Sequence, residues 1–387
     1  MKRIYLDNAA TSWPKPETVY AAVDRYQREI GAPAGRSVYR AAIEADHSVK
    51  NCRAKLARFI GAESAERIVF AANGTAALNL VLHGYVQAHD HIVTTATEHN
   101  SVLRPLASLA QHRGVMHSIV PCDGKGFVDP DQIRRAIWKS TKLIVLNHAS
   151  NVTGAIQNIE AVAKIAREHD IKLLVDAAQS LGHVPIDVQK SGIDFLTAPG
   201  HKGLLGPLGT GLLYIRTGLE AALEPLLQGG TGSVSESPEM PATMPDRFEA
   251  GNLNVAGIYG LDAALDWHAS SEGHAAAERY RAATARLVDG LQAVPGLVFH
   301  GPASREPRAG VASIEVPNVE PQEIAAILDQ QGGVQARAGL HCAPLLHRAL
   351  GTEARGGTVR LSPGPFTTAD EIDAALATLA EVAAAFQ

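Results

Sequence analysis

The chain has 387 residues, of which 46% are hydrophobic, and its formal net charge at pH 7 is −5. This length exceeds what a single hydrophobic core usually organises, so we expect two domains. The charged residues are scattered and form no basic stripe with interleaved aromatic residues, which argues against a nucleic-acid partner. No apolar run approaches the length that spans a bilayer, and Asp7 interrupts the N-terminus before an apolar signal segment forms. We therefore expect a cytoplasmic protein without a membrane partner.

Three cysteines, Cys52, Cys122 and Cys342, are spaced without a C-x-x-C pair. An odd number with this spacing fits neither a disulfide framework nor a zinc site, and it suits a reducing compartment. The sixteen histidines contain no H-E-x-x-H pattern. The sequence therefore predicts no metal site.

An apolar run, a turn and an apolar-periodic segment follow one another in residues 67–87, which predicts a strand, a tight turn and a helix. The turn consists of Asn73, Gly74 and Thr75. Free backbone N–H groups at a helix start, together with the Thr75 hydroxyl, would bind an anion such as a phosphate. Every connection of this kind needs a turn and a cap, so an ordinary helix start also stays open.

Apolar runs then alternate with helical stretches. Strands are predicted to begin at residues 91, 115, 143 and 172, and helices after residue 99, near residue 131 and from residue 159. Continuous apolar strands separated by helices are typical of a mostly parallel sheet covered on both faces. Polar residues gather where these strands end, at Glu98 and His99, at 147–151, and at Asp176 and Gln179. Ligands of such sheets bind at this edge, so we expect one shared site there.

Lys202 lies in a glycine-rich turn between two apolar runs, within residues 195–214. Such surroundings disfavour the charged form of a lysine, and a neutral amine is what a Schiff base with an aldehyde requires. Taken alone, the stretch fits a solvated loop lysine better, since most such lysines face water. A carboxylate such as Asp176 at the end of a buried strand, however, needs a cation or hydrogen-bond donors. Pyridoxal phosphate would use Lys202 for its aldehyde, Thr75 for its phosphate, Asp176 for its ring nitrogen and His99 for its ring face.

The alternation breaks between residues 228 and 254, where Gly, Ser and Pro are frequent. This segment is too long for an ordinary connection, so it is either a functional loop or a mobile one. After residue 261 we expect a long helix to residue 291, strands at 297–300 and 311–316, and a helix at 322–330. A capping box from Thr368 to Glu371 begins a last helix. These elements predict a small α+β domain.

Nine short motifs resemble those of class V aminotransferase-fold enzymes that depend on pyridoxal phosphate, in the cysteine desulfurase and selenocysteine lyase family. In chain order they are YLDNAAT from Tyr5, FAANGTAALNL from Phe70, TEHNS from Thr97, HASNVTG from His148, VDAAQS from Val175, GHKG from Gly200, FEAGNLN from Phe248, RAGLHCAP from Arg337 and TVRLSPGPF from Thr358. One motif could arise by chance. Nine in the same order and at compatible spacings are specific.

The resemblance implies the type I fold of pyridoxal-phosphate enzymes. In this α/β fold a large domain with a mostly parallel seven-stranded sheet carries a smaller α+β C-terminal domain. We expect an N-terminal arm over residues 1–15 that packs with the small domain, a large cofactor-binding domain over 16–260 and a small domain over 261–387. The resemblance also implies a homodimer with shared active sites, to which the segment 228–254 of each chain would contribute.

The resemblance further assigns roles to individual residues. Lys202 would form the Schiff base with pyridoxal phosphate, Asp176 would pair with its ring nitrogen, and Gln179 would bond its phenolic oxygen. His99 would stack on the ring and assist proton transfer. The remaining cofactor contacts would come from Gly74, Thr75, Asn151, His201 and Asn252, and the substrate contacts from Arg360, Asn151, Arg337 and Asn8.

Cys342 decides which reaction the resemblance implies. In this family the cysteine of a His-Cys-Ala motif attacks the sulfur of the cofactor-bound substrate, keeps it as a persulfide and releases alanine. Arg337 and His341 nearby would favour the thiolate. The implied activity is conversion of L-cysteine to L-alanine, with the sulfur passed on to an acceptor protein.

Other interpretations stay open. A selenocysteine lyase, another C–S lyase or an aminotransferase could use the same scaffold, and a module that binds the cofactor without turnover is a further alternative. For a single cysteine such as Cys342 the ordinary alternative is a buried, inert thiol, and packing is the expected role of Cys52. Cys122 receives no role.

Two residues depart from the family pattern. Pro199 stands where a phosphate-binding serine is usual, and it offers neither a hydroxyl nor an N–H. Asn252 stands where a threonine usually contacts the phosphate of the neighbouring subunit. Both departures bear on the phosphate contacts and not on the identity of the cofactor. Cys342 lies only 18 residues before Arg360, so we expect its persulfide to stay near the pocket and not on a long swinging loop.

Overall fold

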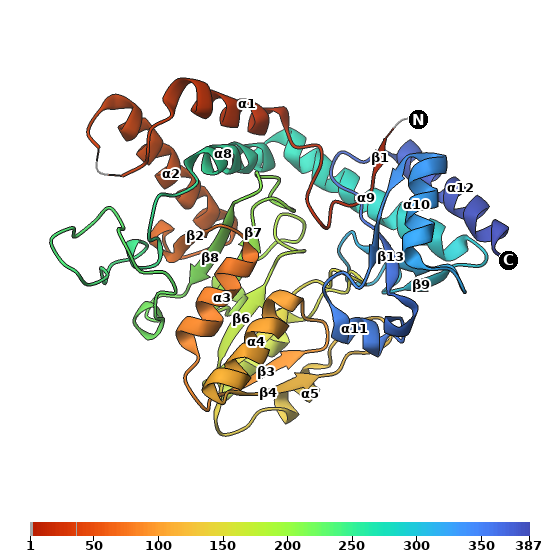
Figure 1. The fold of residues 1–387 in the computed structure, drawn as a ribbon, viewed down its shortest axis with the longest axis horizontal. Coiled ribbons are helices and arrows are strands. Elements are labelled where there is room, and N and C mark those ends of the chain that lie inside the picture. The colour runs from red at the N-terminus through yellow and green to blue at the C-terminus, as the bar shows by residue number, and fades with distance from the viewer. Residues whose placement is uncertain (1–2, 36) are drawn as a thin grey trace.

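The computed structural model describes residues 3–35 and 37–387. Its larger part is built on a seven-stranded sheet, whose strands in spatial order are β2 (Ile68–Ala71), β8 (Gly211–Ile215), β7 (Phe195–Pro199), β6 (Lys172–Asp176), β5 (Thr141–Asn147), β3 (His91–Thr95) and β4 (Met116–Val120) (Figure 1). Neighbouring strands run parallel except at β8, which is antiparallel to β2 and β7. The mostly parallel seven-stranded sheet predicted from the sequence is confirmed.

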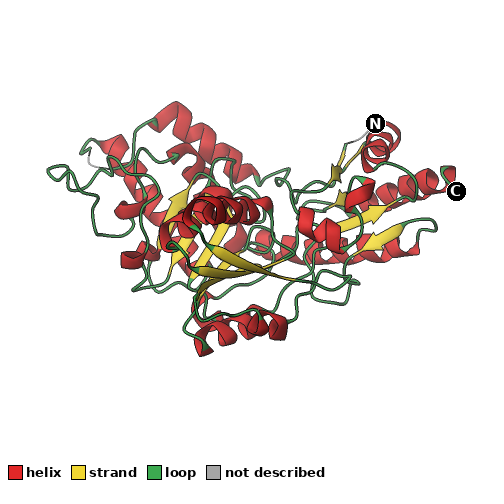
Figure 2. Ribbon diagram, turned by 60° about the horizontal axis from the view of Figure 1, so that its bottom comes forward, coloured by secondary structure: helices red, strands yellow, loops and turns green. Residues whose placement is uncertain are grey.

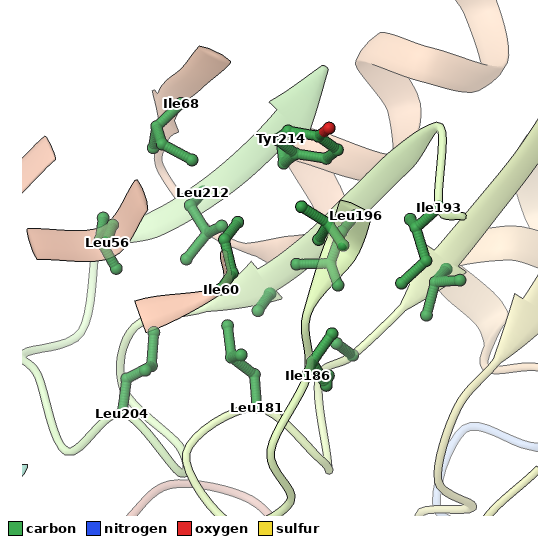
Figure 3. Packing of buried hydrophobic residues seen from close by; sticks show 14 of the residues in the cluster. Leu56, Ile60, Ile68, Leu181, Ile186, Ile193, Leu196, Leu204, Leu212 and Tyr214 are labelled. Carbon is green, nitrogen blue, oxygen red and sulfur yellow. The ribbon is translucent and has the colours of Figure 1, made fainter. Parts of the chain in front are cut away.

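The central strands are apolar because helices cover both faces of the sheet. One face packs against α2 (Arg40–Phe59), α6 (Ile159–Glu168) and α8 (Val255–Ala269), and the other against α3 (Gly74–Tyr85) and α4 (Asn100–Arg113). Figure 3 shows part of the first core, with Leu56 of α2, Leu196 of β7 and Leu212 of β8 among its side chains. Each fully buried leucine contributes about 2 kcal/mol, so these two layers hold the strand ends in fixed positions.

The small domain lies beside the large one and has a sheet of its own (Figures 1 and 2). Its four strands, β12 (Arg337–Gly339), β13 (Thr358–Leu361), β10 (Ala312–Glu315) and β9 (Val298–His300), are antiparallel in that order. The helices α9 (Ser271–Ala293), α10 (Pro321–Gly332) and α12 (Ala369–Ala385) share its core. At the start of α12 the Thr368 hydroxyl and the Glu371 carboxylate each accept the other residue's backbone N–H, as the predicted capping box requires.

The N-terminus joins the small domain before the chain enters the large one. The strand β1 (Ile4–Tyr5) pairs in parallel with β11 (Val334–Gln335), and Ile4 and Leu6 lie in the small-domain core. The chain then forms α1 (Glu17–Arg25) and a π-helix, η1 (Tyr26–Ile30), which the sequence did not predict. The division at residues 15 and 260 stays a prediction; residue 260 lies inside α8, whose Ile258 and Leu265 pack in the large-domain core.

Shorter elements connect these parts. They are η2 (Ala65–Arg67), α5 (Pro130–Arg135), α7 (Val188–Ser191), η3 (Glu220–Ala222), η4 (Asp246–Phe248), α11 (Pro344–Ala349) and η5 (Glu353–Arg355). The segment 228–254 carries η4 and extends from the large domain at the left of Figure 1. Within the described ranges, no helix has both the length and the apolar character needed to cross a bilayer.

Candidate active site

A cavity of about 100 Å³ lies where β5, β6 and β7 end, beside the N-terminus of α3. It is lined mostly by polar residues: Asn73, Gly74, Thr75, Leu78, His99, Ser101, Asn147, Asn151, Asp176, Ala178, Gln179, Pro199, His201 and Lys202. The topology explains this gathering, because parallel strands end at one edge of the sheet. The structure thus brings together nearly all of the residues predicted to bind the cofactor.

Lys202 lies in a tight loop, residues 200–206, between β7 and β8. The loop closes through bonds from the Leu205 N–H to the Lys202 carbonyl (2.9 Å) and from the Gly206 N–H to the Gly200 carbonyl (2.8 Å). Burial lowers the pKa of the Lys202 ammonium to about 8, while the Asp176 carboxylate acts in the opposite direction. About a tenth of an amine with that pKa is neutral at pH 7, far more than for an ordinary lysine. Lys202 is therefore suited to react with an aldehyde.

Asp176 is the last residue of β6, and its side chain is buried. Its Oδ1 accepts the backbone N–H of Ala178 at 2.9 Å. Burial raises the pKa of this carboxyl, and the bond from Ala178 and the charge of Lys202 oppose that effect. A buried carboxylate with so few donors is stabilised by a nearby cation, which a protonated ring nitrogen would supply.

His99 caps the N-terminus of α4. Its Nδ1 accepts the backbone N–H of Ser101 at 3.0 Å, so the proton of the neutral ring lies on Nε2. Burial and the charge of Lys202 lower the pKa of His99 to about 4, which keeps the ring neutral at physiological pH. The Ser101 hydroxyl lies 2.9 Å from His99 Nδ1 and 2.7 Å from the Thr75 hydroxyl. Ser101 was not predicted, although it ends the TEHNS motif.

Gln179 and Asn151 each donate a side-chain N–H to a backbone carbonyl. The acceptors are the carbonyls of Ala9, at 2.9 Å from Gln179, and of His341, at 2.6 Å from Asn151. Oδ1 of Asn151 and Nδ1 of His201 are buried and have no partner among the described residues. Buried polar atoms without partners are costly, so these two atoms indicate a ligand that the cavity would hold.

Arg360 lies on β13 and is only 1% exposed. Its guanidinium donates to the Asn151 carbonyl at 3.1 Å and to the Asp7 carboxylate at 2.8 Å, while its Nε has no partner among the described residues. Burial lowers the pKa of Arg360, and Asp7 opposes this shift. The guanidinium keeps a free donor for a substrate carboxylate. Asp7 was not predicted for the site, although it lies in the YLDNAAT motif.

Cys342 follows β12 in a strained turn, with φ values of 48° for His341 and 59° for Cys342. Non-glycine residues rarely adopt this region, at a cost of about 1–3 kcal/mol each. The turn is held by the Asn151 bond to the His341 carbonyl and by the Asn100 N–H, 2.7 Å from the Cys342 carbonyl. The half-buried Sγ lies 3.8 Å from the Arg337 guanidinium. The thiol is therefore anchored beside the cavity by residues of the large domain.

The expected contribution of His341 to a thiolate is wrong. Burial lowers the pKa of His341 well below its ordinary value, and its Nε2 donates to the Thr358 carbonyl at 3.1 Å. The ring is therefore neutral. Of the two groups predicted to favour the thiolate, Arg337 carries the positive charge.

The family model for class-V aminotransferases matches residues 4–375. The chain belongs to the class-V aminotransferase family. A probable cysteine desulfurase from Methanothermobacter thermautotrophicus is 37% identical over 385 residues, which cover 98% of this chain and 94% of that protein. A cysteine desulfurase from Pectobacterium atrosepticum is 33% identical, and the match covers 98% of this chain and 92% of that protein.

Solved structures share the fold of this class-V aminotransferase. The apo structure of a cysteine desulfurase from Thermococcus onnurineus has a TM-score of 0.92 at 35% identity and covers 99% of this chain and 95% of its own. A cysteine desulfurase from Escherichia coli has a TM-score of 0.88 at 29% identity, and the match covers 100% of this chain and 96% of that one. The fold class predicted from the sequence is confirmed.

Five residues predicted for the site are not among those that line the cavity of this class-V aminotransferase. Cys342, Arg337 and Arg360 lie beside it, whereas Asn8 and Asn252 have other surroundings. The Asn8 amide is used within the arm, where Oδ1 accepts the Trp13 N–H and Nδ2 donates to the Ser362 carbonyl, both at 3.1 Å. Asn252 is exposed and lines a separate, mostly apolar cavity of about 300 Å³. An exposed position is what contact with a neighbouring subunit would require, so the role of Asn252 stays a prediction.

The other two cysteines lie outside the cavity. Cys52 is buried in the large-domain core, where packing was expected, and burial raises its pKa well above the ordinary value. Cys122 packs against Ala343 and Leu346, and burial raises its pKa to about 11. In the parts of the chain that the structure describes, no three His, Cys, Asp or Glu side chains gather in a way that could hold a metal ion.

Glu98 does not line the cavity but bonds a residue that does, Asn147. Glu98 is fully buried, and its Oε1 accepts the Thr95 hydroxyl at 2.8 Å and the Asn147 N–H at 2.9 Å. Burial raises the pKa of Glu98 to about 8, so most of this carboxyl is protonated at pH 7. The sequence placed Glu98 at a strand end without a role; the structure shows that it holds the backbone of Asn147, which lines the cavity.

Proposed function

We propose that this protein is a pyridoxal-phosphate-dependent cysteine desulfurase, which converts L-cysteine to L-alanine and keeps the sulfur as a persulfide on Cys342. The observation that carries this proposal is that Lys202, with its lowered pKa, and the buried Asp176 line one cavity beside the N-terminus of α3. The relatives named as cysteine desulfurases, which match over nearly the whole chain, support it.

The donor set around the cavity suits pyridoxal phosphate. Lys202 would hold the aldehyde of the cofactor, Asp176 its ring nitrogen and Gln179 its phenolic oxygen. The stacked ring of His99 and the amide oxygen of Asn151 would complete the contacts. When bound, the cofactor supplies an electron sink for the bonds at the substrate Cα.

The phosphate would lie at the N-terminus of α3. Its donors would be the Gly74 N–H, the Thr75 hydroxyl and the His201 ring, whose Nδ1 has no partner among the described residues. A Cβ added at Gly74 would lie 3.2 Å from Cδ of Pro199, so glycine allows the helix to approach this strand end closely. We infer that α3 and His201 replace the hydroxyl that Pro199 cannot offer.

The substrate would be held by its carboxylate and attacked at its sulfur. Arg360 would take the carboxylate, with Asn151 beside it. The Cys342 thiolate, stabilised by Arg337, would attack the substrate sulfur as the Cβ–S bond breaks. The carbon side keeps the electron pair and takes up a proton, which the neutral His99 ring would relay. L-cysteine and the thiol thereby yield L-alanine and a persulfide without any oxidant or reductant.

The proposal extends to the partners. We propose a homodimer in which the segment 228–254 and Asn252 of one chain complete the site of the other, and a separate acceptor protein that takes the sulfur from Cys342. The reaction requires Cys342 as a free thiol, which the reducing cytoplasm would preserve. The large domain would carry the cofactor and the small domain Cys342 and Arg360.

An absorption spectrum tests the cofactor. Purified protein supplied with pyridoxal phosphate should show the band of the lysine-bound cofactor, and Lys202→Ala should lose it, because no other amine lines the cavity in the described residues. Lys139→Met, an exposed lysine, serves as the matched control and should keep the band. Absence of the band in folded wild-type protein would contradict the proposal.

Turnover of three substrates separates the desulfurase from other lyases. Cys342→Ala should abolish alanine formation from L-cysteine by at least about a hundredfold, because it removes the nucleophile. Selenocysteine and cystine, whose cleavage does not need this thiol, should be affected less. Undiminished alanine formation from L-cysteine in Cys342→Ala would exclude this mechanism and favour a different C–S lyase.

A further inference from the structure

The two peptide carbonyls that flank Lys202 are each held by a residue from a distant part of the chain. The His201 carbonyl accepts the N–H and the hydroxyl of Ser12, both at 3.0 Å. The Gly203 carbonyl lies 3.1 Å from Nε2 of His268, which donates to it. Ser12 belongs to the N-terminal arm and His268 to the last turn of α8. Neither residue lines the cavity, and neither was predicted from the sequence.

Lys15 fixes the direction in which the Ser12 hydroxyl donates. Its Nζ lies 2.9 Å from the Ser12 hydroxyl oxygen and 3.2 Å from the Ser12 carbonyl. An ammonium group has no acceptor, so the hydroxyl must accept from Lys15, and its own proton is left for the His201 carbonyl. The Thr11 hydroxyl donates to the same carbonyl at 3.2 Å. The arm thus concentrates several donors on one carbonyl oxygen.

The loop is closely packed at the glycines near Lys202, which leave no space for a side chain. A Cβ added at Gly203 would lie 2.3 Å from the Leu181 carbonyl, and one added at Gly200 would lie 2.2 Å from the Thr210 hydroxyl. Ser12 and His268 lie on the two connections between the domains, since the arm runs from β1 to α1 and α8 leads into α9 (Figure 1). The backbone of Lys202 is therefore fixed from both sides by the segments that join the domains.

We propose that Ser12, Lys15 and His268 form a clamp that positions Lys202 for the cofactor. The clamp, meaning these three residues, acts on the backbone, while the amine reaches the cavity on a four-carbon stem. Fixing the backbone removes conformations in which the amine misses the aldehyde, so the clamp speeds attachment of the cofactor and slows its loss. This inference rests on the proposed role of Lys202.

The test follows cofactor attachment and does not use desulfuration. Cofactor-free protein is mixed with pyridoxal phosphate, and the growth of the lysine-bound absorption band gives the rate; a trapping amine then gives the rate of loss. Ser12→Ala and His268→Phe each remove one side-chain hydrogen bond and should slow attachment by about fivefold, the equivalent of about 1 kcal/mol. Ser12→Thr and His268→Gln restore a donor and should recover most of that rate.

A double variant tests whether Lys15 acts through Ser12. Lys15→Met alone should slow attachment. Added to Ser12→Ala it should slow attachment less, because the hydroxyl that it bonds is gone, while its contacts with the Ser12 carbonyl (3.2 Å) and the His201 carbonyl (3.5 Å) remain. Ser12 and His268 bond different carbonyls, so the effects of Ser12→Ala and His268→Phe on the attachment rate should multiply. Lys139→Met is the control for loss of a lysine charge and should match wild type. Urea unfolding verifies that each variant is folded.

The outcomes separate the clamp from the proposed function. Folded Ser12→Ala and His268→Phe variants that attach the cofactor at the wild-type rate would overturn the clamp and leave the proposed function intact. A wild-type protein that forms no band would overturn the proposed function and the clamp with it. If Ser12→Ala does not fold, the comparison of His268→Phe with His268→Gln decides, since only the former loses the donor.

Discussion

Arg360 is buried, and within residues 3–35 and 37–387 its one carboxylate partner is Asp7. We propose that the substrate carboxylate binds at the same place. A buried guanidinium needs such a partner when no substrate is present, because an unpaired charge in the interior is costly. When substrate enters, two carboxylates face one guanidinium. Asp7 should therefore stabilise the substrate-free protein and weaken the binding of substrate.

Asp7→Asn tests this opposition. It should lower the free energy of unfolding of the cofactor-free protein by about 1–3 kcal/mol, because the arginine charge loses its counter-ion. Added L-alanine should stabilise the variant more than wild type, since its carboxylate takes the vacant place. Asp373→Asn, which breaks an exposed pair with Arg286, is the control and should cost less than about 1 kcal/mol. Equal stabilisation of Asp7→Asn and wild type by L-alanine would contradict the competition.

The lowered pKa of Lys202 predicts how cofactor attachment depends on pH. Only the neutral amine reacts, so the rate should rise about tenfold per pH unit below pH 8 and level off above it. The pKa of His99, about 4, lies outside this range, whereas that of Glu98 lies near 8 and needs a control. Burial also lowers the pKa of Lys15 to about 8, so Lys15→Met is a second control. The same profile in Glu98→Gln and in Lys15→Met assigns the step to Lys202, and the rate with a free amine corrects for titration of the cofactor. An attachment rate that still rises at pH 10 would show that Lys202 has the pKa of an ordinary lysine.

At the scale of elements, the site depends on close approach between the loop 200–206 and the turn after β6. Gly203 packs so tightly against the Leu181 carbonyl that a methyl group there must push two backbone segments apart. Gly203→Ala should lower the free energy of unfolding by about 1–3 kcal/mol and also slow cofactor attachment. Gly124→Ala, where a Cβ meets nothing within 4 Å, is the control. An unchanged free energy of unfolding in Gly203→Ala would show that the loop backbone shifts to accommodate the methyl group.

The sequence predicted those parts of the site that follow from strand order. Thr75, His99, Asp176 and Lys202 come after strands or turns with clear apolar signals, and a parallel sheet places such ends together. The contacts of the N-terminal arm could not be predicted in this way. Asp7 and Arg360 are 353 positions apart, and nothing in local periodicity indicates that they meet. Likewise Asn8 belongs to a recognisable motif, yet its amide is used inside the arm.

At the scale of the whole molecule, the proposed reaction would use residues of both domains. Asp176 ends β6 of the large sheet and Lys202 lies in the loop after β7, while Cys342 and Arg360 lie in the small-domain part of the chain. Hydrogen bonds of Asn100 and Asn151 with His341, Cys342 and Arg360 join the two. In the proposed reaction, the small domain would therefore bring the nucleophile to a cofactor that the large domain would hold. The central claim is that Cys342 receives the sulfur of L-cysteine.

Peptide mass analysis tests that claim most directly. The cofactor-loaded protein is incubated with L-cysteine in the absence of an acceptor, the thiols are blocked, and the peptide that contains Cys342 is examined. The account predicts one added sulfur atom on Cys342, formed together with an equal amount of L-alanine, and none on the peptides of Cys52 and Cys122. L-alanine formed at the wild-type rate while Cys342 gains no sulfur would contradict it.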